Sequence, residues 1–224
     1  MILFASVIVL AVGLGYAFGG RLRRFDRLRL RWWGLAVVGL AIQFVPLPEG
    51  AGGSDLVVRT AVLSVSYVML LTFAVLNAYL PGLPLVLIGL ACNFTVIVAN
   101  GGMPVSEGAL RSSGQADVIE MLRDAGSEKH HLMNEDDVLT FLADVIPVPK
   151  PIGQAISVGD VFVYAGLILL AVATMRGRIP SRYPTTWGAY RGKHRPGSTE
   201  PEPHPVMLDP AEPLPGATTS GSGP

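Results

Sequence analysis

The sequence predicts an all-α membrane protein, a polytopic helical bundle of five transmembrane helices. Half of its 224 residues are hydrophobic and only 15% are charged, a composition typical of membrane proteins. Apolar runs of near-membrane length recur along the chain, and a helix crosses a bilayer in roughly 20 residues. We expect spans at about residues 2–20, 32–47, 56–80, 85–100 and 157–175.

The distribution of charge predicts how these spans are oriented. Six arginines lie between residues 21 and 31, and six more basic residues follow residue 175, whereas the loop 101–156 holds nine acidic and four basic residues. Basic residues collect on the cytoplasmic side of membranes, so we expect the N-terminus and the loop outside and the C-terminus in the cytoplasm. The same pattern gives no nucleic-acid-binding surface. The expected partners are the lipid bilayer and either a homo-oligomer or another membrane protein.

Each span has a local justification. In the first, positive charge follows the apolar run rather than preceding it, which favours a retained helix over a cleaved signal peptide. The second starts with Trp32 and Trp33, residues that favour the membrane interface. The third has one charge, Arg59, close enough to the outer end to extend towards water. Residues 81–84 (PGLP) form a turn to the fourth, and the fifth is followed at 176–224 by a Pro-rich, polar segment, predicted to be a disordered cytoplasmic tail.

The outer loop carries two patterns typical of short helices. Val118, Met121 and Leu122 give an apolar face to residues 117–125, which Gly126 ends. In the second, Asn134 is placed to cap a helix that begins with three acidic residues and ends at Pro147. The two helices fit a lid over a binding site and a plain structural cap equally well.

Two aspartates are the candidate catalytic residues. An acid such as Asp160, about four residues into a span, indicates a functional site by default, but Ser157 and Asp160 also fit a capping box at the start of a helix. Asp144 has apolar neighbours and is expected near water on the second loop helix. The capping and functional interpretations of Asp160 can hold together.

The candidate binding residues are Asn100, Gly101, Gly102, His130 and His131. Asn93 and Asn100 share one face of the fourth span, where interhelical hydrogen bonding is the usual role of an amide. Gly101 and Gly102 first indicate a helix stop, with a backbone site for an anion as the alternative. Adjacent histidines on a helix point about 100° apart, so the pair alone chelates a metal poorly. A metal site would need Glu128, Asp136 or Asp137 folded back onto the histidines, and we expect none. No cofactor motif is found either, so no cofactor is expected.

Four short segments stand out: Asn100–Ser106, Lys129–His131, Ala143–Pro147 and Ser157–Val161. Together they resemble an uncharacterised family of bacterial multi-pass membrane proteins, a domain of unknown function, over roughly residues 1–175. This resemblance implies a location in the bacterial cytoplasmic membrane, and it implies nothing about activity.

Two segments are also similar to lipoprotein signal peptidase, a membrane aspartyl protease. Ser157-Val158-Gly159-Asp160 resembles its Asn-x-Ala-Asp segment, and Ala143–Ile146 resembles a stretch upstream. That family places its other aspartate three residues after an asparagine on the preceding helix, whereas here Val96 follows Asn93 at that spacing. The resemblance therefore implies a hydrolase only if Asp144 joins Asp160 within a few ångströms.

The sequence names no reaction, and it favours a binding, assembly or accessory component that acts through the outer loop over an enzyme. A membrane-embedded aspartyl hydrolase using Asp160 with Asp144 is the alternative. A small transporter is the third class, disfavoured because the spans are nearly free of charge and show no inverted repeat.

Overall fold

The computed structural model describes residues 2–45, 53–124 and 129–180 of the chain. Its elements are, in order, α1 (Ile2–Ala17), η1 (Leu22–Arg27), α2 (Trp33–Ile42), α3 (Gly53–Leu76), α4 (Leu83–Asn100), β1 (Met103–Val105), α5 (Glu107–Ser113), α6 (Ala116–Asp124), β2 (His130–Leu132), η2 (Thr140–Leu142), β3 (Ile146–Val148), β4 (Gln154–Ile156) and α7 (Val158–Arg176). The fold is mostly helical, as the sequence predicts, with four short strands that it does not predict. The predicted tail from residue 181 and most of the predicted outer turn near residue 50 lie outside the described residues.

Three of the described helices are long and apolar enough to cross a membrane: α3, from Val57 to Leu76, α4 and α7. This indicates a membrane protein. The helices α1 and α2 are equally apolar but have 16 and 10 residues. At about 1.5 Å per residue they extend only about 24 and 15 Å, so a count of five spans stays a prediction.

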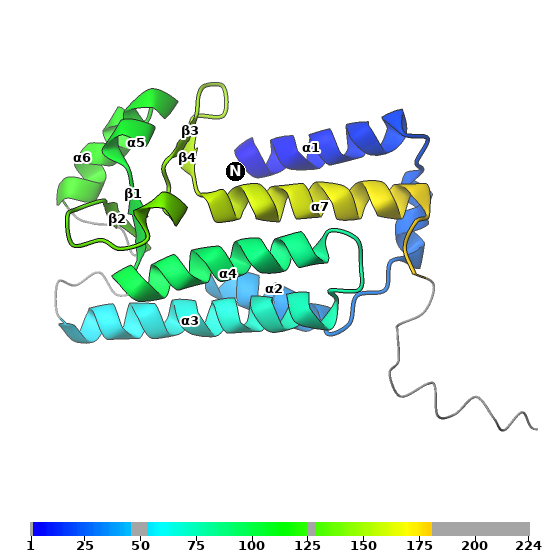
Figure 1. Ribbon diagram of the computed structural model, residues 1–224, viewed down its shortest axis with the longest axis horizontal. Helices are drawn as coiled ribbons and strands as arrows, with labels where there is room; N and C mark the ends of the chain where they lie inside the picture. Colours follow the sequence, from blue (N-terminus) through cyan, green and yellow to red (C-terminus); the bar gives the residue numbers. More distant parts are fainter. Residues whose placement is uncertain (1, 46–52, 125–128, 181–224) are drawn as a thin grey trace, which may run out of the picture. The chain divides into compact units, whose positions relative to one another are not determined.

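Figure 1 shows the helices of the bundle lying side by side, with α7 between α1 and α4. The helix α3 packs against both α4 and α2. Glycines bring α4 and α7 into close contact. A Cβ atom added at Gly89 would meet the carbonyl oxygen of Gly159, and one added at Gly166 would meet that of Gly82. Small residues of this kind let helix backbones approach each other in a membrane.

The basic segment 21–31 and the described start of the second one, Arg176 and Arg178, lie at one end of the bundle (Figure 1). The backbone N–H of Arg21 and the guanidinium of Arg24 both donate to the carbonyl of Met175, which joins the segment after α1 to the end of α7. Residues 101–156, which we name the cap, lie at the opposite end (Figure 1). The charge segregation in the sequence is therefore also a segregation in space.

The cap is a small mixed structure. In it, β1 pairs with β2 in parallel, and β3 pairs with β4 in antiparallel fashion. The helix α6 lies where the sequence predicts one, and α5 precedes it, capped by the Ser106 hydroxyl and ended by Gly114 in the left-handed conformation. A buried cluster joins the two helices to β1 and β4 through Val105, Leu110, Ile119, Leu122 and Ala155.

The prediction of a helix from Asn134 to Pro147 is wrong, because only the single turn η2 forms there. The bonds at Asn134 are those of a helix N-terminus, because the Asn134 amide oxygen accepts from the Asp136 N–H and Asp137 accepts from the Asn134 N–H. Beyond this turn, the Asn100 side chain binds both the N–H and the carbonyl of Val138, two groups that a continuing helix would use. Side-chain bonds to these groups compete with helix formation.

Candidate functional site

Three cavities lie within the cap or between the cap and the helices of the bundle. The arginine chamber, of about 520 Å³, is lined by Arg59 of α3, by the end of α4, by the start of β2 and by the acidic turn that follows β2. The aspartate chamber, of about 140 Å³, lies among α3, α4 and α7 and contains both candidate catalytic aspartates. The apolar chamber, of about 530 Å³, is lined mainly by α5, α6 and β4. His130 borders all three.

All five candidate binding residues line the arginine chamber: Asn100, Gly101, Gly102, His130 and His131. Gly101 and Asn100 have structural roles there. Gly101 ends α4 in the left-handed conformation, with φ 69°, as its sequence position predicts. The Asn100 amide is committed to the carbonyls of Val96 and Val138 and to the Val138 N–H. Asn100 therefore holds the cap onto α4 rather than offering a free group to a ligand.

The two histidines lie on a strand, not on a helix, and have different acidic partners. The His131 ring Nε2 lies 2.8 Å from Asp137 Oδ1, whereas His130 Nε2 lies 3.7 Å from Asp144 Oδ2. Within residues 2–45, 53–124 and 129–180, no group of three or more His, Cys, Asp or Glu side chains is placed to hold a metal ion.

Asp160 begins α7 in the predicted capping box. Its N–H donates to the Ser157 hydroxyl at 2.9 Å, and its Oδ2 accepts from the Ser157 N–H at 3.1 Å. Its other oxygen, Oδ1, accepts from the Asn93 amide at 2.9 Å. The Ser157 hydroxyl completes a ring by donating to Asn93 Oδ1. The capping box of α7 is therefore also hydrogen-bonded to α4 through Asn93, which is the interhelical role that Asn93 is expected to have.

Asp144 departs from its expected surroundings, because it lies neither on a helix nor near bulk water. It is 7% exposed and is held by backbone pairing with β1, where its N–H donates to the Pro104 carbonyl and its carbonyl accepts from the Ser106 N–H. Its Oδ1 has no hydrogen-bond partner among the described residues. Burial, and secondarily the charge of Asp160, raises the pKa of Asp144 to about 8. The carboxyl is therefore mostly protonated at neutral pH.

His130 complements Asp144. The His130 side chain is 46% exposed where it borders the chambers. Desolvation by the surrounding protein nevertheless lowers the pKa of His130, although the negative charge of Asp160 acts to raise it. A neutral imidazole thus faces a protonated carboxyl at pH 7. Such a pair can exchange a proton with a bound ligand without separating charge.

Asp144 and Asp160 line the same small chamber, but each has its own partners. The structure gives no hydrogen bond between these two described carboxyl groups, and both Asp160 oxygens already accept bonds from Ser157 and Asn93. Their coupling is electrostatic, through the effect of Asp160 on the pKa of Asp144.

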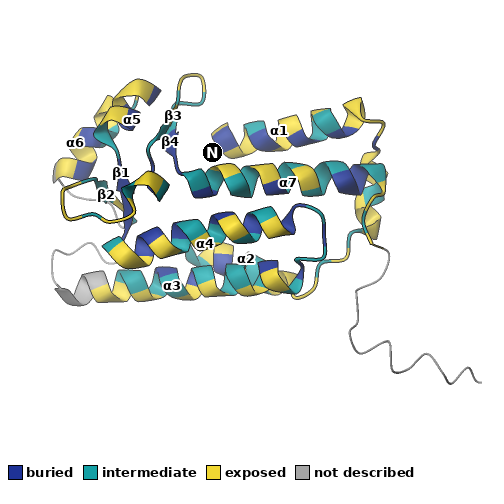
Figure 2. Ribbon diagram, in the orientation of Figure 1, coloured by how far each residue is buried: buried dark blue, intermediate teal, exposed yellow. Residues whose placement is uncertain are grey.

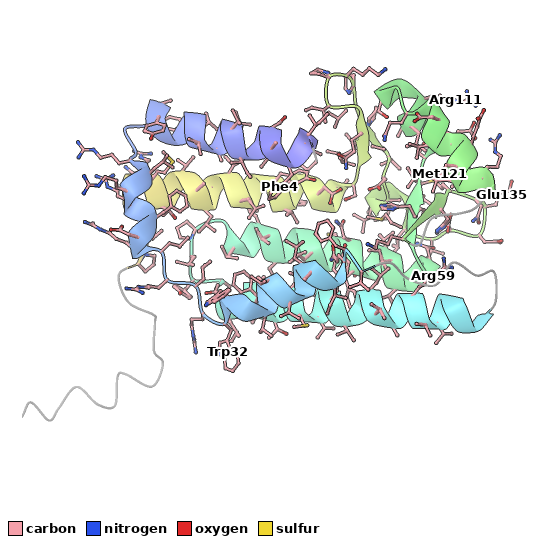
Figure 3. The ribbon with its side chains drawn as sticks, turned by 180° about the vertical axis from the view of Figure 1, so that it is seen from behind. Phe4, Trp32, Arg59, Arg111, Met121 and Glu135 are labelled. Carbon is pink, nitrogen blue, oxygen red and sulfur yellow. The ribbon has the colours of Figure 1, made fainter. Side chains whose placement is uncertain are left out.

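The sequence did not identify several residues of the site. Arg59 is expected only to extend towards water, yet it lines the arginine chamber, and its Nε is buried without a hydrogen-bond partner among the described residues (Figure 3). Lys129 borders both the arginine and the aspartate chambers. Gln43 and Tyr67 line the aspartate chamber. A polar side chain inside an apolar run is the signal that could have identified Gln43 and Tyr67.

Comparison with known proteins agrees with the resemblance that the sequence motifs indicate. An uncharacterised protein of Thermotoga maritima is 38% identical over 123 residues, which cover 53% of this chain and 68% of the relative. No solved structure matches the chain. The model of a family of unknown function, DUF5317, matches residues 27–172. The chain therefore belongs to the DUF5317 family.

Proposed function

We propose that the protein crosses the cytoplasmic membrane five times, with the cap and N-terminus outside and the C-terminus in the cytoplasm. The chain directions support this: α1, α3 and α7 start at the cap end of the bundle, whereas α2 and α4 start at the basic end (Figure 1). The basic end then faces the cytoplasm, as basic residues favour. Lipid covers the exposed apolar faces of α1 and α2, which Figure 2 shows in yellow.

A topology experiment tests this arrangement. A reporter fused after Pro196 is expected to be active only as a cytoplasmic reporter, and one inserted near Ser127 only as an extracytoplasmic one. The opposite pattern would reverse the orientation. If both reporters are on one side, the number of spans is even between these two points and the five-span arrangement is wrong.

We further propose that the protein is a binding component, and that the arginine chamber takes a ligand's anionic group, a phosphate or carboxylate. One observation carries this proposal: Arg59 lines a 520 Å³ cavity, and its guanidinium has a buried Nε without a hydrogen-bond partner among the described residues. An unsatisfied buried donor costs about 1 to 3 kcal/mol, so this guanidinium gains from turning towards an anionic acceptor in the cavity. Guanidinium groups match phosphate and carboxylate geometry.

The other charges of the chamber fit an anion at the Arg59 side. Lys129 adds a second cation to the lining. Of the two aspartates in the lining, Asp137 is already held by His131 and by the Asn134 N–H, and Asp136 lies on the exposed turn of the cap. The positive charge therefore comes from Arg59 of α3 and from Lys129, which directly precedes β2, and the negative charge comes from the turn after β2.

Binding to protein in phosphatidylcholine nanodiscs tests the proposal. Inorganic phosphate and glycerol phosphate, titrated by calorimetry, represent a free solute, and phosphatidylglycerol added to the nanodiscs represents a lipid headgroup. For whichever of these anions binds the wild type, Arg59→Gln should lower the affinity at least tenfold. Arg123→Gln, which alters an exposed ion pair with Glu107, should leave that affinity unchanged. Equal binding by the wild type and Arg59→Gln would refute the proposal.

A membrane aspartyl hydrolase is the second candidate, favoured because Asp144 and Asp160 share one chamber and Asp144 can donate a proton at neutral pH. In a strain with a deletion phenotype, loss of function in Asp144→Asn and Asp160→Asn at normal abundance would support it. Equal loss of abundance in Asp160→Asn and Ser157→Ala would instead indicate that Asp160 acts as a helix cap.

A further inference from the structure

The apolar chamber is a second cavity of ligand size, separate from the arginine chamber. Its volume of about 530 Å³ falls within the roughly 300–1,000 Å³ of small-molecule sites. Most of its lining side chains are apolar, among them Leu110, Val118 and Leu122. The chamber can therefore hold an apolar chain, and what it selects depends on its few polar groups.

Those polar groups are unequally available. The Gln115 side-chain oxygen already accepts from the Ser113 hydroxyl and the Ala155 N–H. Asp144 lies at the other extreme, because its Oδ1 has no partner among the described residues and its Oδ2 is 3.7 Å from His130. The Asp144 carboxyl therefore brings an oxygen without a hydrogen-bond partner among the described residues to the chamber wall, beside His130.

The rim of the chamber is apolar and adjoins the membrane helices. Ile2, the first residue of α1, and Met121 of α6 both line the chamber and are 59% and 54% exposed. Ile152, also in the lining, packs against a buried cluster of Leu3, Val7 and Ile156 at the start of α1. Figure 1 shows this start of α1 beside β4. An exposed apolar rim at the end of a lipid-facing helix opens favourably towards lipid and unfavourably towards water.

From this geometry we infer that the apolar chamber binds a single-chain amphiphile from the outer leaflet, with an uncharged hydrogen-bonding group, such as a hydroxyl or ester, against Asp144 and His130. The chain gains little by leaving lipid for an equally apolar chamber, so the polar contact decides which amphiphile binds. A neutral group suits a buried carboxyl that is itself protonated at neutral pH. The choice of the outer leaflet rests on the proposed orientation, whereas the arginine chamber takes no part, so the inference is independent of the proposed anion site.

Photo-crosslinking of full-length protein in nanodiscs tests the inference. The probe is a monoacylglycerol with a diazirine in its chain, and mass spectrometry locates the adducts. We expect adducts on residues 118–122 and 152–155. Unlabelled monoacylglycerol should compete at concentrations at least tenfold lower than an alkyl sulfate or an alkyl trimethylammonium of equal chain length. Strongest competition by either charged amphiphile, or adducts spread evenly over the helices of the bundle, would overturn the inference.

Variants give a second, matched measurement. Val118→Trp fills the chamber and should reduce the adduct yield at least tenfold, whereas Val138→Trp, on an exposed part of the cap, should leave it unchanged. Arg59→Gln should also leave it unchanged, which separates this inference from the anion site. An undiminished yield in Val118→Trp would refute binding in this chamber.

Discussion

Replacement of Asp144 by Asn tests the electrostatics of the site most simply, because it keeps the shape of the side chain and removes its ionisation. The folded protein holds this carboxyl at a pKa of about 8, against an ordinary value of 3.8. A folded-state pKa above the unfolded one stabilises the protein at low pH, and that stabilisation is lost as pH rises through 8. Between pH 6 and 9 the loss amounts to about 3 kcal/mol.

The assay is thermal unfolding of the purified protein in one detergent across that pH range. Wild type should lose about 3 kcal/mol more than Asp144→Asn between pH 6 and 9, which corresponds to roughly 6 to 12 °C in Tm. The two proteins differ at this one side chain, so the difference between their pH profiles reports the ionisation of Asp144. Asp136→Asn, a change at an exposed acid of the cap, should follow the wild type. Parallel curves for wild type and Asp144→Asn would refute a buried, protonated Asp144.

Three further predictions concern the packing that positions the chambers, each measured as unfolding free energy. Ser157→Ala removes the cap of α7 and leaves Asn93 Oδ1 without its donor, so it should cost about 2 kcal/mol; an unchanged stability would contradict the lock between α4 and α7. Asn100→Ala removes both bonds to Val138 and should cost about 1 to 2 kcal/mol and increase proteolysis of the cap; unaltered proteolysis would argue against that role. Gly89→Ala should cost about 1 to 3 kcal/mol because its Cβ meets the Gly159 carbonyl, whereas Gly13→Ala, with nothing within 4 Å, should be neutral, and equal effects would refute close helix contact there.

Features fixed by neighbouring residues could be predicted from the sequence. The capping box of Ser157 and Asp160, the stop of α4 at Gly101 and the short helix α6 depend on residues within one or two helical turns. The long apolar runs likewise indicate membrane helices, because hydrophobicity over 20 residues does not depend on distant partners. Their packing order does depend on such partners, and the sequence did not provide it.

The cap could be predicted only in part, because distant segments determine it. Met103 in β1 pairs with His130 in β2, and strands of three residues leave little periodicity to detect. The helical pattern after Asn134 is interrupted at Val138 by side-chain bonds from Asn100, a residue that the local pattern does not contain.

The candidate site shows the same division. Each polar residue could be identified singly as unusual, and the five candidate binding residues do share one cavity. Asp144 is buried because its backbone pairs with Val105, and Arg59 lines the chamber because α3 packs beside it. Both positions depend on contacts between distant segments, so neither could be predicted from the sequence.

The central claim, that Arg59 binds an anion in the arginine chamber, is tested most directly by solid-state NMR of the protein in nanodiscs with ¹⁵N-labelled arginine and bound phosphate. We predict a ¹⁵N–³¹P dipolar contact that is present in the wild type and absent in Arg59→Gln. A contact that persists in Arg59→Gln, or no contact at a phosphate concentration that saturates binding, would contradict the claim.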